Sequence, residues 1–286
     1  MSLYRGYDRP QLDDQYNNSK RVPAAPEIMA RFQSWSAEVM RRPGVRLDLA
    51  YGPAAGERLD VFPADRPRAP IMIFFHGGYW QMRDKADFNF VADGFRGKGA
   101  VVVSANYTLC PEVTMTELAR QCRAAVAWTW RHAEEIGGDR ARIFVCGHSA
   151  GGHVTALLAS TEWPRFASDL PVDTLKGGLA ISGLYELEPI RLTYLNDRLR
   201  MDAAEAAAQS PMNLVPRRAP RLMLAVGGIE SAEFLRQQAD YAAAWRKAGL
   251  EVEEIPMPGH DHFSIIGALG DPTSALARAA HRLMGL

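Results

Sequence analysis

The sequence predicts an α/β protein whose central sheet has about eight strands, is mostly parallel and is flanked by helices. Two observations support this prediction. Short runs of β-branched and other apolar residues alternate with segments of helical period, and the first two runs follow each other with no helix between them. A sheet with that order begins antiparallel and continues parallel. The 286 residues, 47% of them hydrophobic, suffice for one large core, so we expect a single domain over 1–286.

The expected elements follow in order along the chain. A polar N-terminal arm spans 1–42 and ends in a helix, because Ile28, Phe32, Trp35 and Val39 recur at helical spacing. The expected strands are VRLDLAYG, RLDVFPA, IMIFFHGG, AVVVSANY, RIFVCGHS, GGLAISG, RLMLAVGG and LEVEEIPMP. The expected helices after the arm cover about 116–136, the segment after the elbow described below, 231–249 and 272–286.

Between the sixth and seventh strands, about 184–218 combines helical pieces with several prolines. An insertion at this place in an open α/β sheet projects over the carboxyl ends of the strands, so we expect a small cap. The polar arm either covers the mouth of the same site or contributes to a homodimer contact.

The composition of the chain limits the classes of binding partner that we expect. Lys plus Arg and Asp plus Glu number 33 each, so the zero net charge gives no electrostatic case for nucleic acid or an acidic membrane, and a small neutral substrate fits better. No apolar stretch suggests a signal peptide or a membrane span, so we expect a cytoplasmic protein. The three cysteines lack paired spacing, and we expect neither a disulfide framework nor a metal or organic cofactor.

The stretch IFVCGHSAGGHVTALLA, 143–159, places G-x-S-x-G between a strand and a helix. In that setting the pattern predicts a nucleophile elbow with Ser149 as the nucleophile. Gly147 and Gly151 are required because the strained turn brings neighbouring backbone too close for a Cβ. The alternative is that Ser149 only caps the following helix.

A serine hydroxyl is a weak nucleophile unless a base accepts its proton and an acid orients that base. In the chain order serine, acid, histidine, the histidine follows the last strand. His260 and His262 in PGHDHFSII both satisfy this order, and spacing alone does not separate them. Glu230 is the first carboxylate after the seventh strand and is our choice of acid, with Glu233 as competitor. Asp261 lies too near the histidines in sequence to orient one easily.

The run IMIFFHGGYW, 71–80, is a strand that ends in His-Gly-Gly. Loops of this kind present backbone N–H groups to a developing oxyanion, and glycines let the backbone approach the substrate. We expect Gly78 and Tyr79 to donate together with Ala150. His76 and Gly77 are expected to support the loop rather than to take part in the chemistry.

Two further residues are candidates for substrate binding. Trp80 stands beside the oxyanion loop and could form an aromatic wall, and His148 precedes the serine. For both, local packing is the alternative.

The carboxylates also have an alternative to the role of catalytic acid, because Glu230 or Glu233 could simply place negative charge at a helix N-terminus.

The run ANYTLCPE, 105–112, resembles Y-R-L-A-P-E of the hormone-sensitive-lipase-like branch of the α/β-hydrolases. Within that branch, HGGYWQ, GHSAGGH, VGGIESAEFLRQQ and GHDHFSII are similar, in this order, to stretches of the kynurenine formamidase (arylformamidase) group. The resemblance covers about 45–286 and implies the α/β-hydrolase fold. It also implies that the histidine before phenylalanine, His262, is the base and that Glu230 is the acid, although the group usually has aspartate there.

The resemblance implies a serine hydrolase of tryptophan catabolism that removes a small acyl group from an aryl formamide such as N-formylkynurenine, through an acyl-enzyme. A carboxylesterase acting on small acyl esters uses the same machinery and is the alternative. A remote alternative is a non-catalytic binding protein on the hydrolase fold. The expected partner is a small-molecule substrate, with a homodimer as the expected assembly if the arm forms a contact.

Overall fold

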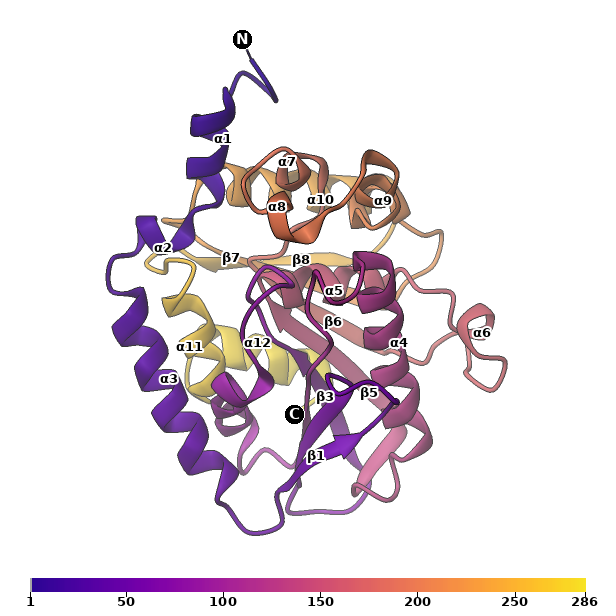
Figure 1. The fold of residues 1–286 in the computed structure, drawn as a ribbon. Helices are drawn as coiled ribbons and strands as arrows, with labels where there is room; N and C mark the ends of the chain where they lie inside the picture. The colour runs from indigo at the N-terminus through magenta and orange to yellow at the C-terminus, as the bar shows by residue number, and fades with distance from the viewer. Residues whose placement is uncertain (1) are drawn as a thin grey trace.

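The computed structural model describes residues 2–286 (Figure 1). Within them, the strands form one eight-stranded sheet in the order β1-β2-β4-β3-β5-β6-β7-β8. The strands are β1 Arg46–Ala50, β2 Arg58–Phe62, β3 Ala69–Phe75, β4 Val101–Ala105, β5 Gly138–His148, β6 Gly177–Ile181, β7 Arg221–Gly227 and β8 Val252–Met257. The β1–β2 and β2–β4 pairs are antiparallel, and the remaining pairs are parallel. This confirms the predicted fold class.

Helices cover both faces of the sheet, which explains why the central strands are continuous apolar runs. In β3, Ile71 and Ile73 join one core cluster while Met72 and Phe74 join the opposite one, as the alternation of a strand requires. The first cluster includes residues of α4 (Met115–Arg131) and α5 (Ala150–Ala159). The second lies under α3 (Ala25–Met40), η2 (Asn89–Phe95), α11 (Ser264–Gly270) and α12 (Ala275–Met284).

The N-terminal helix α3 forms where its apolar spacing predicts a helix. Ile28, Phe32 and Val39 are buried, and Phe32 stacks on Phe90 of η2 with ring centroids 4.4 Å apart. Ahead of α3, the arm forms α1 (Arg9–Tyr16) and α2 (Asn18–Arg21). Asp8 begins α1 with a capping box, in which its side chain accepts from the N–H of Gln11.

Other elements complete the chain: η1 (Lys85–Asp87), α6 (Trp163–Phe166), α7 (Glu188–Arg191), α8 (Asn196–Leu199), α9 (Ala203–Ala208), η3 (Pro211–Leu214) and α10 (Ala232–Lys247). Helices α7, α8 and α9 belong to the segment 184–218 and lie near α10 at the top of the view in Figure 1. Leu187, Ile190 and Leu195 of this segment are buried in the main core, so it is packed onto the domain.

The structure contains short segments that the sequence did not predict. Between β3 and β4 the chain forms the 3₁₀ segments η1 and η2, and the helices α6 and α11 were not expected. Of these, η2 and α11 border cavities, where packing overrides local propensity. No helix within residues 2–286 has the length and apolar character needed to cross a lipid bilayer.

Candidate active site

Ser149 lies at the sharp turn between β5 and α5. Its backbone has φ 58° and ψ −116°, a conformation that an L-residue adopts only at a cost of about 1–3 kcal/mol. The neighbouring hydrogen bonds hold the turn: the Ser149 N–H donates to the carbonyl of Ile181 at 2.8 Å, and its own carbonyl accepts from His153 at 3.0 Å. This strain at a buried serine is the geometry of a nucleophile elbow.

The two glycines of the motif stand where backbone approaches most closely. A Cβ on Gly151 would lie 1.9 Å from the carbonyl oxygen of Phe75, and one on Gly147 would lie 2.3 Å from the carbonyl oxygen of Gly151. Real Cβ contacts are never that short, so no other residue fits without moving β3 or α5. The structure thus supplies the physical reason for the glycine pattern seen in the sequence.

His262 connects Ser149 to Glu230. Its Nε2 lies 3.0 Å from the Ser149 hydroxyl, and its Nδ1 lies 2.6 Å from Oε2 of Glu230. Because a carboxylate only accepts hydrogen bonds, Nδ1 carries the proton and Nε2 is free to accept one from the serine. All three side chains are largely buried, with Ser149 1%, His262 6% and Glu230 9% exposed. The arrangement can raise the nucleophilicity of the serine.

Glu230 lies in the turn after β7 and is held by two further bonds. Its Oε1 accepts from the N–H of Gly227 at 2.8 Å and from the hydroxyl of Ser182 at 2.5 Å. These bonds fix the longer glutamate side chain so that the other oxygen reaches His262. The sequence analysis did not identify Ser182; its only signal is a small polar residue directly after the apolar strand β6.

The competing acid Glu233 has a different role. It lies in the first turn of α10, accepts from the hydroxyl of Tyr16 at 3.0 Å and forms an ion pair with Arg236 at 2.8 Å. It makes no bond with a histidine within residues 2–286. The structure therefore joins Glu230, and not Glu233, to the histidine.

The other two candidates near the histidine are also placed elsewhere. Asp261 accepts from the N–H groups of Phe263 and Ser264, both at 2.8 Å, and so caps the start of α11. His260 borders a separate surface hollow with Pro258 and Gly259, away from Ser149. Of the two histidines, His262, and not His260, lies between Ser149 and Glu230.

Three backbone N–H groups lie near the serine, two in the loop after β3 and one at the start of α5. Those of Gly78, Tyr79 and Ala150 donate to no acceptor within residues 2–286. Gly78 has φ 117° and Tyr79 φ 48°, and a Cβ on Gly78 would lie 2.1 Å from the carbonyl oxygen of Met82. Unpaired N–H groups held by strained backbone beside a nucleophile are suited to bind an oxyanion.

His76 supports this loop from beneath. Its ring donates to the carbonyl of Gly77 at 2.7 Å, its Nε2 lies 2.8 Å from Oδ1 of Asn106, and its ring stacks on Tyr107 with centroids 4.5 Å apart. Burial lowers the pKa of His76. Its contacts join the loop to the residues that follow β4, and its supporting role stays a prediction.

The structure corrects the expectation that Trp80 forms a wall of the substrate site. Its side chain is fully buried, and its indole N–H donates to Nδ1 of His153 at 3.1 Å. It does not line the cavity at Ser149, whereas Tyr79 does. Residue 80 has φ 59°, and at this left-handed turn the indole packs into the core, a geometry that a sequence pattern does not reveal.

His148 does line the cavity. Its Nε2 donates to the carbonyl of His262 at 2.8 Å, and its Nδ1 is buried with no partner within residues 2–286. Burial, together with the neighbouring His262, lowers the pKa of His148 well below its usual range, so the ring is neutral. Its bond holds the backbone of His262; its role in substrate binding stays a prediction.

The cavity at Ser149 has a volume of about 140 Å³. The arm contributes Tyr16, Asn17, Asn18 and Ser19, the loop after β3 contributes Gly77, Gly78, Tyr79, Gln81, Met82 and Arg83, and the segment 184–218 contributes Tyr194 and Leu195. Met29, Phe88, Phe263 and Ile266 complete an apolar wall beside Ser149, His148 and His262. The arm therefore forms part of the site.

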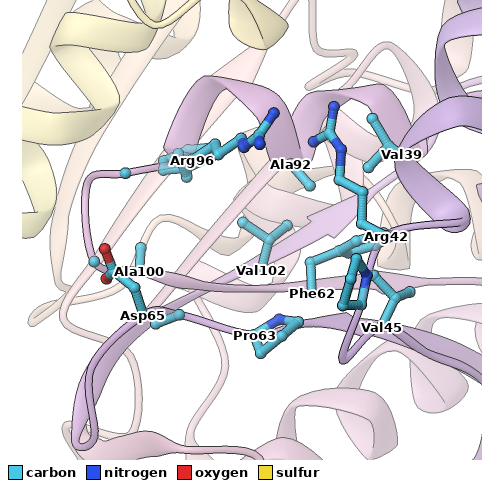
Figure 2. A pocket seen from close by; sticks show the side chains of 15 residues that line it. Val39, Arg42, Val45, Phe62, Pro63, Asp65, Ala92, Arg96, Ala100 and Val102 are labelled. Atoms are coloured by element: carbon cyan, nitrogen blue, oxygen red, sulfur yellow. The ribbon is translucent and has the colours of Figure 1, made fainter.

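A second, larger cavity of about 250 Å³ lies between the end of α3, η2 and the strands β2 and β4. Figure 2 shows its lining, with Arg42 and Arg96 on the same side. Its fifteen lining residues include no serine, cysteine or histidine. We call it the α3–η2 cavity. Its one carboxylate, Asp65, has no hydroxyl, thiol or imidazole beside it in the lining, whereas Ser149 and His262 line the smaller cavity, which is the candidate active site.

The fold and the site define an α/β hydrolase. A family model described as alpha/beta hydrolase fold matches residues 72–265. Among solved structures, a protein from Silicibacter sp. tm1040 is 30% identical and superposes with a TM-score of 0.84 over 96% of this chain and 99% of that one. The hyperthermophilic esterase of Pyrobaculum calidifontis, 18% identical over 94% of both chains, has the same fold at a TM-score of 0.74.

The kynurenine formamidase of Danio rerio is 33% identical over 100% of this chain and 99% of its own length. That of Salmo salar is 32% identical over the same shares of the two chains. The esterase LipC of Mycobacterium tuberculosis is 28% identical over 80% of this chain and 62% of its own. The chain is a hydrolase of the α/β-hydrolase family and belongs to its kynurenine formamidase group.

Proposed function

We propose that the chain is an arylformamidase, a serine hydrolase that removes the formyl group from an aryl formamide of the N-formylkynurenine type. The observation that carries the proposal is the bonded series Ser149–His262–Glu230 beside three unpaired N–H groups. The likeness to kynurenine formamidases over the full chain supports the formamide as the substrate.

In the proposed reaction, the Ser149 oxygen attacks the formyl carbon while its proton passes to Nε2 of His262. Glu230 stabilises the imidazolium that forms, and the N–H groups of Gly78, Tyr79 and Ala150 bind the oxyanion. When the C–N bond breaks, His262 gives its proton to the departing aryl amine. A water molecule, deprotonated by His262, then attacks the formyl ester, and formate leaves as the serine regains its proton.

The shape of the cavity suits a small acyl group and an aromatic leaving group. The formyl group has one carbon, so most of the cavity is left for the aryl amine. Phe88, Phe263 and Tyr79 line the space with aromatic rings, and such rings pair favourably with an aryl group. Aspartate is usual at the acid position of this group, and the bonds from Gly227 and Ser182 support glutamate in the same role.

The alternative is a carboxylesterase for small acyl esters, which the similarity to the esterase LipC favours. The same serine, base and oxyanion donors serve an ester and an amide. We do not propose the non-catalytic binding protein, because the relatives are hydrolases and both the serine and the histidine are in place.

The test is kcat/KM for N-formyl-L-kynurenine and for 4-nitrophenyl acetate on one preparation, with Ser149→Ala as the blank. We expect turnover of the formamide at about 10⁴ M⁻¹s⁻¹ or faster. If only the ester is cleaved, the serine mechanism holds and the carboxylesterase replaces the arylformamidase. Ester and formamide turnover that survives in Ser149→Ala contradicts both.

We further propose that 184–218 acts as a cap and that the arm closes the mouth of the cavity, since both contribute lining residues. A cytoplasmic location is proposed as well, supported by three cysteines that are free and buried. A homodimer through the arm is the remaining hypothesis on assembly. Sedimentation velocity of the full chain distinguishes the dimer from a monomer.

A further inference from the structure

The lining of the cavity at Ser149 includes one lysine or arginine and no carboxylate. Among its lining residues, Arg83 is the one lysine or arginine, and no aspartate or glutamate is present. A carboxylate-free cavity with one guanidinium attracts an anionic group. The cavity thus differs from the expectation of an uncharged substrate that the zero net charge of the chain suggested.

The N–H groups of the Arg83 guanidinium form no hydrogen bond within residues 2–286. It forms a loose ion pair with Asp87, whose Oδ2 lies 3.9 Å from Nη1, beyond hydrogen-bond distance. The other oxygen of Asp87 accepts from the side chain of Gln33 at 2.8 Å. Arg83 donates no hydrogen bond to another group within residues 2–286, and its side chain is 35% exposed. Its donors are therefore available to a ligand.

The backbone fixes Arg83 relative to the oxyanion donors. Arg83 has φ 78°, in the left-handed region that costs a non-glycine residue about 1–2 kcal/mol. It ends the loop that contains Gly78, whose carbonyl accepts from Gln81 and Met82, both at 3.1 Å. The Cγ of Arg83 lies 3.0 Å from where a Cβ on Gly78 would stand. The stem of Arg83 thus packs along the oxyanion loop, and Arg83 lines the cavity.

We propose that Arg83 determines the substrate specificity of this cavity by binding a carboxylate on the leaving group. The inference rests on the proposed function. If the acyl group is formyl, with one carbon, most of the cavity holds the leaving group. A guanidinium binds a carboxylate with two parallel hydrogen bonds, which orients an aryl amine as well as attracting it. The enzyme therefore prefers aryl formamides that carry a carboxylate over uncharged ones.

The experiment compares two substrates that differ only in charge: N-formyl-L-kynurenine and its carboxamide, in which an amide replaces the carboxylate. For Arg83→Gln we expect kcat/KM for the carboxylate to fall by about 10- to 100-fold, chiefly through KM, as for a lost bond to a charged group. The carboxamide should change by less than about twofold, because it never made the charged contact.

Two further variants serve as comparisons. Arg83→Lys keeps the charge without the planar fork, so it should recover part of the preference. Arg96→Gln removes an arginine from the α3–η2 cavity and should leave both substrates unchanged. An equal loss on both substrates in Arg83→Gln would mean that Arg83 only supports the oxyanion loop, and no loss on either would mean that the carboxylate lies elsewhere; each result overturns the proposal.

A second substrate pair separates this proposal from the formamidase assignment. The acetyl esters of 3-hydroxybenzoate and of 3-hydroxybenzamide carry the charge, or its neutral replacement, on the leaving group. If wild type cleaves these esters but no formamide, the formamidase assignment fails. A preference for the carboxylate ester that disappears in Arg83→Gln would still support the role of Arg83, and equal turnover of the two esters by wild type would overturn it.

Discussion

The cavity at Ser149 and the α3–η2 cavity differ in how their polar groups are satisfied. In the first, three N–H groups and a buried histidine nitrogen have no partner within residues 2–286, and the backbone at Ser149 and Gly78 is held at positive φ. In the second, Arg42 forms an ion pair with Asp93 that Trp35 supports through its indole N–H at 2.5 Å. Arg42 of the larger cavity is thus paired, whereas Arg96 and Asp65 of the same lining form no ion pair within residues 2–286.

Although burial alone would raise the pKa of Asp93, the hydrogen bonds from Arg42 and Trp35 lower it. Such a satisfied group stabilises the fold and has little left to offer a ligand. Unsatisfied donors cost free energy of folding, so they persist only where the surrounding packing holds them. Such groups are found mainly at active sites and binding sites. Helix α3 reaches both cavities, with Met29 at one and Val39 at the other. The comparison teaches that unpaired backbone N–H groups beside a nucleophile, and not volume, distinguish the active site.

The largest expected effect comes from the nucleophile. Ser149→Ala should lower kcat/KM for the formamide and for 4-nitrophenyl acetate by about 10⁵- to 10⁶-fold, because the hydroxyl bonded to His262 is lost. Ser160→Ala, a serine that ends the same helix α5, is the matched control and should retain activity. Steady-state kinetics with both substrates is the measurement. A loss of less than about 10²-fold would show that another group is the nucleophile.

Glu230→Gln should follow, with kcat reduced by about 10⁴-fold, because the neutral amide no longer orients His262 or stabilises its charged form. The control is Glu233→Gln, which breaks the bond from Tyr16 and the ion pair with Arg236 and should affect thermal stability far more than kcat. Comparable kcat losses in the two variants would contradict the assignment of the acid.

A pair of glycines compares the two cavities directly. Gly78→Ala should lower kcat by about 10²- to 10³-fold, because the new Cβ displaces the loop that carries two oxyanion donors. Gly97 lines the α3–η2 cavity at φ 68° with nothing within 4 Å of an added Cβ. Gly97→Ala is strained as well but should leave kcat unchanged. Equal kcat values for the two variants would remove the oxyanion role of the loop.

The next effect concerns stability and pH. Burial lowers the pKa of His153 from 6.5 to about 4, so below pH 6.5 the unfolded chain binds a proton that the folded chain rejects. The free energy of unfolding should therefore fall as the pH drops from 6.5 toward 4, by at most about 1.4 kcal/mol per pH unit from this residue. Urea unfolding of wild type and His153→Gln across this interval measures the difference. Parallel pH profiles would exclude His153 as a source.

The smallest effect is expected in the α3–η2 cavity. Arg42→Gln removes the ion pair with Asp93 and should reduce the free energy of unfolding by about 1–2 kcal/mol. Because the pair is remote from the nucleophile, kcat/KM should stay within about twofold of wild type. Urea unfolding and steady-state kinetics on one preparation measure both. A large kinetic loss without loss of stability would assign this cavity a part in the reaction.

Local pattern was sufficient where the physical constraint is local. The continuous apolar run in IMIFFHGG, the helical spacing of α3 and the glycines around Ser149 all predict what the structure contains. Trp80 shows the limit of that reasoning. Its neighbours in sequence belong to the oxyanion loop, but the left-handed turn at 79–80 accompanies an indole packed into the core against His153.

By itself, the sequence determined the α/β class, the elbow and the loop with its two glycines, because periodicity and close backbone approach act over a few residues. Spacing left His260 and His262 open, and the resemblance to formamidases indicated His262. Only the tertiary structure decided which groups meet: Ser149 and His262 are 113 residues apart, and His262 and Glu230 are 32 apart. A hydrogen bond forms only within about 3 Å, and the packing of eight strands sets those distances.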